Sequence, residues 1–383
     1  MLLRNLSLSL FFTLTLCLFP IADEGESINV YNYSADGITC SYSAEVEFPL
    51  NLHFEMSAES DADISDVRLH YTVEQESFAE VVSEVFIEFE PGTAVDVEWT
   101  WDMRRTGGLP PGTVVEYWWT VEDINGDDMA TTPAELRFDD DRYSWQSLTE
   151  DEVTVYWYQG SQSFAEEIMS AARMALSRLA EDTGAHPRKE VNLYVYASSQ
   201  DLLDAMIFPQ EWTGGATYTR YGVIVIGINT SNLTWGKRAI AHELAHLIVH
   251  QMVSNPYNQI PTWLSEGLAM YNEGELENTF IAYLEKAIRE DNLISVRSLA
   301  SPFSAYAGQS YLSYAQSYSL VEFLIDSYGQ AKMLELLNTF SRGSSYDGAL
   351  ETVYGFNMNG LEDLWRVEIN QKYQVGTVTT LLH

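Results

Sequence analysis

Two histidines and a glutamate stand close together in the run His242-Glu-Leu-Ala-His246. An apolar-rich segment that starts at Thr234 surrounds them and predicts a helix, which ends before Pro256. Residues four apart on a helix are offset by about 40° and one turn, so both imidazoles can reach one metal ion. Glu243 then projects beside the ion rather than onto it, which is the position of a general base.

His250 lies on the same predicted helix but does not complete the set of ligands. On a straight helix it stands about 12 Å beyond His242, too far for three rings to meet one ion. A metzincin would need a glycine and a histidine three and six residues after His246, and Val249 and Met252 occupy those positions. We therefore interpret His250 as a packing residue or as a hydrogen-bond donor to one of the side chains that bind the metal.

The segment Trp-Leu-Ser-Glu-Gly-Leu-Ala follows, with Glu266 about one and a half turns into a helix expected to start at Pro261. Together with His-Glu-Leu-Ala-His, it resembles the gluzincin metallopeptidases, in particular the peptidase MA-like family of bacterial exported proteins. The resemblance extends over residues 153–365. It implies a single zinc ion as cofactor, with Glu266 as the third ligand beside His242 and His246.

With three protein ligands, zinc would lower the pKa of a water molecule toward neutrality and polarise the substrate carbonyl. Glu243 would take the proton of that water and pass it to the leaving amine. The resemblance to gluzincin aminopeptidases also implies that Tyr314 stabilises the oxyanion, with Tyr318 as the alternative. The chain contains 23 tyrosines, so a packing role for either one stays open.

The chain departs from better-known relatives at two places. The aminopeptidases carry a glutamate that grips the amine of the substrate, but the corresponding stretch here, 214–218, has no residue that can do so. Endopeptidase and exopeptidase modes both stay open. Thermolysin-like enzymes have a carboxylate four residues after the glutamate ligand, where this chain has Met270, so no partner is predicted for the histidines.

The elements that must position these residues begin near residue 147. Strands expected over 153–158, 191–196 and 223–228 alternate with helices, and the rest of the chain is helical. The strand at 223–228 either lines the cleft and pairs with an extended substrate or is simply a core strand. Before residue 147, short alternating strands separated by turn residues predict an all-β sandwich.

The predicted fold class is multidomain, with an N-terminal all-β sandwich before an α+β zincin-like metallopeptidase domain that ends in an all-helical subdomain. The boundaries are 1–22 for a signal peptide, 23–147 for the sandwich and 148–383 for the peptidase domain. The peptidase domain divides into an α/β part, 148–254, and a helical part, 255–383. Residues 109–123 resemble the later strands of a fibronectin type III or immunoglobulin-like module, which says little about function.

The first 22 residues have the pattern of a signal peptide, because Arg4 precedes an apolar run and acidic residues follow it. We expect an extracytoplasmic protein, secreted or at the cell surface, without a transmembrane anchor after signal removal. Cys17 allows a lipoprotein interpretation, but the bulky Leu16 before it argues against lipidation. Cys40 is the other cysteine of the chain, so the processed protein has no intramolecular disulfide.

The net charge of −36 argues against nucleic acids and anionic membranes as partners. Residues 23–147 hold 29 acidic and 5 basic side chains, a net charge of −24 that we attribute to solubility or to a salty habitat. The expected partner is a peptide or protein substrate, and the sequence does not predict the oligomeric state.

Two alternatives to a peptidase remain. One is a non-catalytic extracellular binding protein with a structural zinc site, and the other is a zinc hydrolase of a non-peptide amide or ester. Glu243 argues against the first, because a purely structural site has no use for a glutamate there and usually takes a fourth protein ligand.

Overall fold

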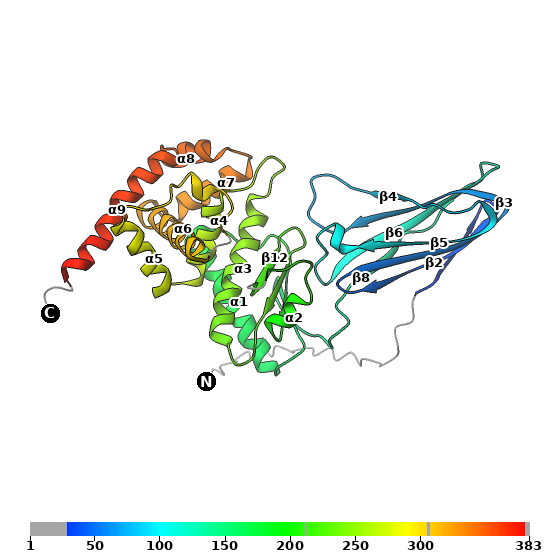
Figure 1. The fold of residues 1–383 in the computed structure, drawn as a ribbon, viewed down its shortest axis with the longest axis horizontal. Helices are drawn as coiled ribbons and strands as arrows, with labels where there is room; N and C mark the ends of the chain where they lie inside the picture. Colours follow the sequence, from blue (N-terminus) through cyan, green and yellow to red (C-terminus); the bar gives the residue numbers. More distant parts are fainter. Residues whose placement is uncertain (1–28, 211–212, 305–306, 380–383) are drawn as a thin grey trace, which may run out of the picture.

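The computed structural model describes residues 29–210, 213–304 and 307–379 (Figure 1). A β-rich region comes first and a helical region last, as the sequence predicted. The expected signal peptide, with Cys17, lies outside the described residues. Among the described residues, no helix combines the length and the apolar character needed to cross a membrane.

The N-terminal region is built of β-strands apart from one 3-10 turn at Met103–Arg105, and its strands form one connected eight-stranded sheet. Its long strand β3 is shared between two groups of strands: its first half pairs with β2 and β5, and its second half with β4 and β6. Side chains of the two groups meet, since Tyr117 of β6 packs edge-on against Tyr42 and Phe54. The strands are β1 (Tyr31–Ala35), β2 (Ile38–Glu47), β3 (Asn51–Val73), β4 (Ser83–Phe86), β5 (Gly92–Asp102), β6 (Thr113–Asp123), β7 (Asp128–Ala130) and β8 (Ala134–Phe138).

A second sheet of five strands follows: β9 (Gln146–Glu150), β10 (Val153–Trp157), β11 (Val191–Tyr196), β12 (Gly215–Tyr218) and β13 (Val223–Gly227). The strand order is β12-β13-β11-β10-β9, with β12 antiparallel at one edge. The strand expected at 223–228 is therefore an interior strand, and all five residues of β13 are buried. Of its two interpretations, lining the cleft is wrong, because β12 covers the edge that β13 would need to offer.

Both faces of the second sheet are covered, which explains why its central strands are buried on both sides. One face, with Val155 and Leu193, packs on helices α1 (Gln162–Thr183) and α3 (Leu233–Val253). The other face, with Tyr194 and Tyr196, packs on the N-terminal β-rich region. Trp145 stands edge-on to both tyrosines at 5.4 and 5.1 Å. The two parts of the chain therefore share a continuous apolar core.

Helix α4 (Thr262–Glu273) packs against both α3 and α6 (Ala307–Tyr328). Its Trp263, Leu264 and Leu268 are buried. Gly267 faces α6 so closely that an added Cβ would press on the backbone oxygen of Ser317 and lie 2.6 Å from Val321 Cγ2. The remaining helices are α2 (Ser199–Leu203), α5 (Asn278–Arg289), α7 (Gln330–Ser341), α8 (Tyr346–Tyr354) and α9 (Met358–Thr379).

We expect Gly267→Ala to lower the free energy of unfolding by about 1–3 kcal/mol, because the added methyl group must push α4 away from α6. Urea denaturation followed by circular dichroism measures this change. The matched control is Gly308→Ala on α6, whose added Cβ would meet nothing closer than 3.9 Å. That variant should be neutral or more stable by up to about 1 kcal/mol, because alanine favours helix. Equal stability of the two variants would contradict the close packing.

Candidate metal centre

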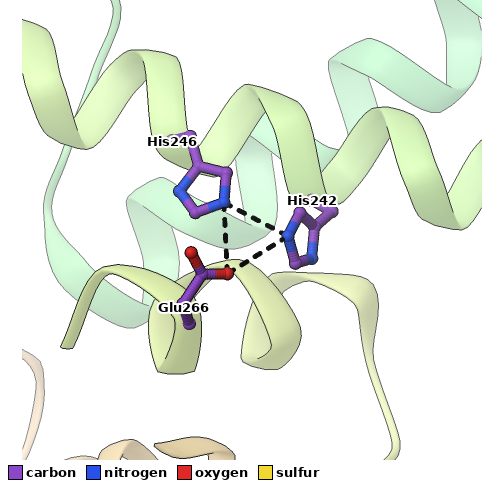
Figure 2. A group of neighbouring side chains, drawn as sticks. All are labelled: His242, His246 and Glu266. Atoms are coloured by element: carbon purple, nitrogen blue, oxygen red, sulfur yellow. Dashed lines mark hydrogen bonds and ion pairs between the residues drawn. The ribbon is translucent and has the colours of Figure 1, made fainter. Parts of the chain in front are cut away.

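Helices α3 and α4 bring His242, His246 and Glu266 together (Figure 2). The Nε2 atoms of the two histidines lie 3.2 Å apart. Glu266 Oε2 lies 3.6 Å from Nε2 of His242 and 3.5 Å from Nε2 of His246. The structure therefore places the three residues of the predicted ligand set around one point.

The spacing of these three atoms fits a bound ion. Ligand atoms at about 2.0–2.1 Å from a tetrahedral zinc ion lie about 3.3–3.4 Å from one another. Two imidazole nitrogens and one carboxylate oxygen are also a donor set that zinc accepts. The three side chains are 18–20% exposed, so the site opens to solvent on one side. The group can hold a metal ion and leave a coordination position for another molecule.

Each histidine is oriented by a hydrogen bond at its second nitrogen. Glu273 Oε1 lies 2.8 Å from His242 Nδ1, and Ser265 Oγ lies 3.1 Å from His246 Nδ1. With Nδ1 occupied, each ring presents Nε2 to the ion. Sequence reasoning missed both partners, because it looked for a carboxylate only at Met270. Glu273 stands seven residues after Glu266, which is two helical turns and so the same face of α4.

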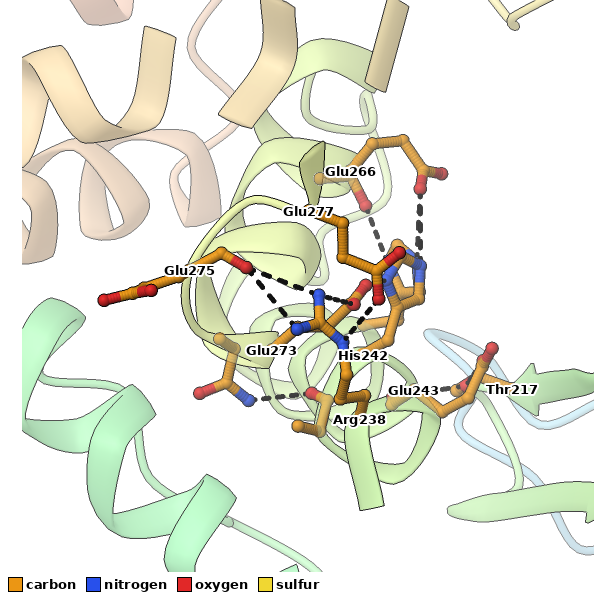
Figure 3. Close-up of polar contacts among 12 residues, drawn as sticks. Thr217, Arg238, His242, Glu243, Glu266, Glu273, Glu275 and Glu277 are labelled. Carbon is orange, nitrogen blue, oxygen red and sulfur yellow. Dashed lines mark hydrogen bonds and ion pairs between the residues drawn. The ribbon is translucent and has the colours of Figure 1, made fainter. Parts of the chain in front are cut away.

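Arg238 holds Glu273 from the other side. Its Nη2 lies 3.0 Å from Glu273 Oε2, and its Nε lies 3.3 Å from Glu277 Oε1 (Figure 3). Arg238 stands one turn before His242 on α3, so α3 supplies both the histidine and the cation that anchors its partner. The carboxylate of Glu273 is thereby fixed at both of its oxygens.

The carboxylates around the histidines favour positive charge at the site. Burial lowers the pKa of His242, but the neighbouring carboxylate of Glu266, the hydrogen bond to Glu273 and the charge of Glu243 outweigh it and raise the pKa to about 10. Burial raises the pKa of Glu266, but the charge of His246 and the close approach of both imidazoles hold it well below its usual range. A metal cation can take the place of the proton that these carboxylates stabilise on His242.

Glu243 is held beside the ligands by strand β12. Thr217 Oγ1 donates a hydrogen bond to Glu243 Oε2 at 2.6 Å and lies 3.2 Å from the backbone oxygen of the same residue. An added Cβ at Gly215 would come within 3.3 Å of Glu243 Oε1, so the strand lies directly against the carboxylate. Sequence reasoning considered the stretch 214–218 only for the anchor that it lacks and missed Thr217.

Tyr314 and Tyr318 both stand on α6 but lie in different surroundings. Burial raises the pKa of Tyr314, and the nearby charges of Glu266, Glu243 and Glu273 raise it further. Burial also raises the pKa of Tyr318, but there the nearby charge is that of Glu322, and the ring packs on Tyr271 at 5.6 Å.

His250 stands apart from the three possible ligands, as its spacing predicted. It lines the cleft that leads to them. Burial lowers its pKa, and its Nε2 atom is buried without a hydrogen-bond partner among the described residues.

A model of the Peptidase MA superfamily matches residues 171–371, slightly more than half of the chain. This range contains α3 and α4 with all three possible ligands. No curated protein matches the chain.

Several solved structures match parts of the chain at low TM-scores. A β-1,3-glucan binding domain of carbohydrate-binding module family 56 is 23% identical over 26% of this chain and 98% of its own, with a TM-score of 0.17. A polysaccharide deacetylase from Bacillus cereus is 9% identical over 55% of this chain and 66% of its own, with a TM-score of 0.22. Likeness at this level supports no conclusion about fold or function.

We expect Glu273→Gln to lower the affinity for zinc by about 10- to 100-fold, because the neutral amide holds His242 less firmly than a carboxylate does. Competition with a chromophoric chelator at neutral pH measures this affinity. Glu277→Gln is the matched control, since Glu277 also pairs with Arg238 but contacts neither histidine. Equal affinities for the two variants would refute the orienting role of Glu273.

Proposed function

This chain belongs to the Peptidase MA superfamily, and from that premise we propose that it is an exported zinc peptidase that hydrolyses peptide bonds in polypeptides. The observation that carries the proposal is the position of Glu243, which lines the same cavity as His246 and Glu266 but is not one of the three convergent ligand residues. The signal-peptide pattern of residues 1–22 supports export.

His242, His246 and Glu266 would hold the zinc. When bound there, zinc supplies a water molecule of lowered pKa and polarises the carbonyl of the substrate. The hydrogen bond from Thr217 occupies Oε2 of Glu243 and leaves Oε1 as the proton acceptor. Glu243 takes the proton of the attacking water there and returns it to the nitrogen of the leaving amine.

Tyr314 is the donor that we assign to the developing oxyanion. A tyrosine hydroxyl is protonated at neutral pH, and the raised pKa of Tyr314 widens that range, so it can donate a hydrogen bond. Its position near Glu243 and Glu266 supports this assignment over Tyr318, which lies near Glu322.

A binding protein with a purely structural ion is the weaker alternative. Such a site has no need for a base, whereas here Glu243 lines the same cavity as His246 and Glu266 and is held there by Thr217. A non-peptide amide or ester would use the same chemistry, and the substrate assay below distinguishes it from a peptide.

We expect residues 23–383 to bind one zinc ion and to hydrolyse an unstructured protein such as casein. Glu243→Gln should keep the zinc and lose about 10²- to 10⁴-fold in rate, because the amide cannot accept the proton. Metal content by mass spectrometry and release of soluble peptides are the two measurements. Absence of zinc from both proteins would contradict the ligand assignment. Zinc without cleavage by either protein would favour the binding protein or a non-peptide substrate.

Tyr314→Phe should lower kcat by about 10²- to 10³-fold and change KM little, because the hydroxyl acts on the oxyanion and not on the bound substrate. Steady-state kinetics on a fluorogenic peptide cleaved by the wild type measure both constants. Tyr318→Phe serves as the control and should retain activity. A loss confined to Tyr318→Phe would transfer the role to that residue.

A further inference from the structure

The loop between β3 and β4 reaches from the N-terminal β-rich region to the candidate metal centre. A cavity of about 490 Å³ is lined by His246 and Glu266 and also by Glu76 and Phe78 of this loop. Both parts of the chain therefore form the walls of one cleft.

Glu76 fixes the loop in this position. Its backbone N–H donates to the backbone oxygen of Arg220 at 2.7 Å. Lys189 Nζ lies 3.2 Å from Glu76 Oε2, and Ser254 forms a further hydrogen bond with the same side chain. The Glu76 side chain is only 17% exposed. These contacts hold Phe78, two residues later, at the mouth of the cleft.

Phe78 presents an apolar surface that the protein itself does not cover. The residue is 59% exposed, although it lines the cavity. The cavity is also lined by Val249 and Val253 of α3 and by Ile260. Burial of another apolar group between this exposed ring and these apolar residues is energetically favourable.

The backbone of a substrate has a matching partner in the same cleft. Strand β12 ends the second sheet, so its outer edge pairs with no other described strand. Thr217 of β12 and Thr219 just after it line the cavity with Phe78. An extended polypeptide can add to such an edge through main-chain hydrogen bonds, and alternate side chains of the added strand then point into pockets.

We propose that Phe78 and the 74–82 loop form a substrate subsite that takes a large apolar side chain of an extended polypeptide lying along β12. This inference rests on the proposed peptidase function and defines its substrate class. It makes the N-terminal β-rich region a part of the peptidase cleft. We infer a polypeptide as the occupant because one cavity is lined both by ligand residues and by Thr217 of the edge strand β12, to which an extended chain can add.

The test is the cleavage profile of the full chain on a mixture of peptides from a digested proteome, read by mass spectrometry. The wild type should favour a large apolar residue at one fixed position relative to the cleaved bond. Phe78→Ala should lose this preference and show about 10- to 100-fold lower kcat/KM on the favoured peptides. Zinc content and thermal stability should not change, since Phe78 is exposed.

Phe86→Ala is the matched control. Phe86 lies on β4 of the same region and is 60% exposed, but it is not among the residues that line the cavity. It should leave the profile unaltered. An unaltered profile in Phe78→Ala would overturn the subsite and leave the peptidase function intact.

If the wild type cleaves nothing, the proposed function fails, and peptide binding tests the subsite alone. Zinc-loaded Glu243→Gln is immobilised, and the peptides that it retains from the same mixture are identified. Retention of apolar peptides by Glu243→Gln, and its loss in the double variant that also carries Phe78→Ala, supports the subsite. Equal retention by the single and the double variant overturns it.

Discussion

The position of helix α4 between α3 and α6 is the constraint on which the site depends. Among the described residues, the hydrogen bonds and ion pairs that reach the two histidines from outside α3 come from α4: Glu266 offers the third ligand atom, Glu273 orients His242 and Ser265 orients His246. A buried hydrogen bond of 2.7 Å from Asn272 Nδ2 to the backbone oxygen of Ala241 sets the distance between α3 and α4. A shift of α4 would change the ligand atom and both orienting bonds together.

The arrangement also concentrates negative charge around the two histidines. Three carboxylates, those of Glu243, Glu266 and Glu273, surround the histidines in a chain of net charge −36. Arg238 balances the charge of Glu273. The raised pKa of His242 favours a proton there, which balances part of the remaining negative charge. A cation bound there would remove the remaining repulsion, and its binding would then be coupled to the stability of the α3–α4 pair.

The parts of the site that repeat along one helix could be predicted from the sequence, and the parts that depend on tertiary packing could not. The spacing of His242 and His246 predicts their common face, because helical periodicity is local. Thr217 belongs to a four-residue strand whose partner Glu243 lies 26 residues later, and no local pattern connects them.

Similar limits applied to the fold. The order of an N-terminal β-rich region, a mixed α/β part and a helical part was confirmed at this coarse level. The likeness to fibronectin type III modules and the domain boundaries stay predictions. The sequence predicted only short strands before residue 147 and missed the 23-residue strand β3, which continues through the acidic residues Glu59, Asp61 and Asp63. Those side chains point outward while Ala58 and Ile64 are buried, so a period of two was hidden by composition.

The second sheet connects the N-terminal β-rich region to the helices that carry the candidate metal centre. Its helix-covered face supports α3, and its opposite face, with Tyr194 and Tyr196, needs the N-terminal β-rich region to shield it from water. Because that region is fixed there, its loop at Glu76 can carry Phe78 to the cleft at a constant distance from the ligands. The apolar core between the two parts therefore determines more than stability. It holds the N-terminal β-rich region, and with it the loop that carries Phe78, beside the cavity that His246 and Glu266 line.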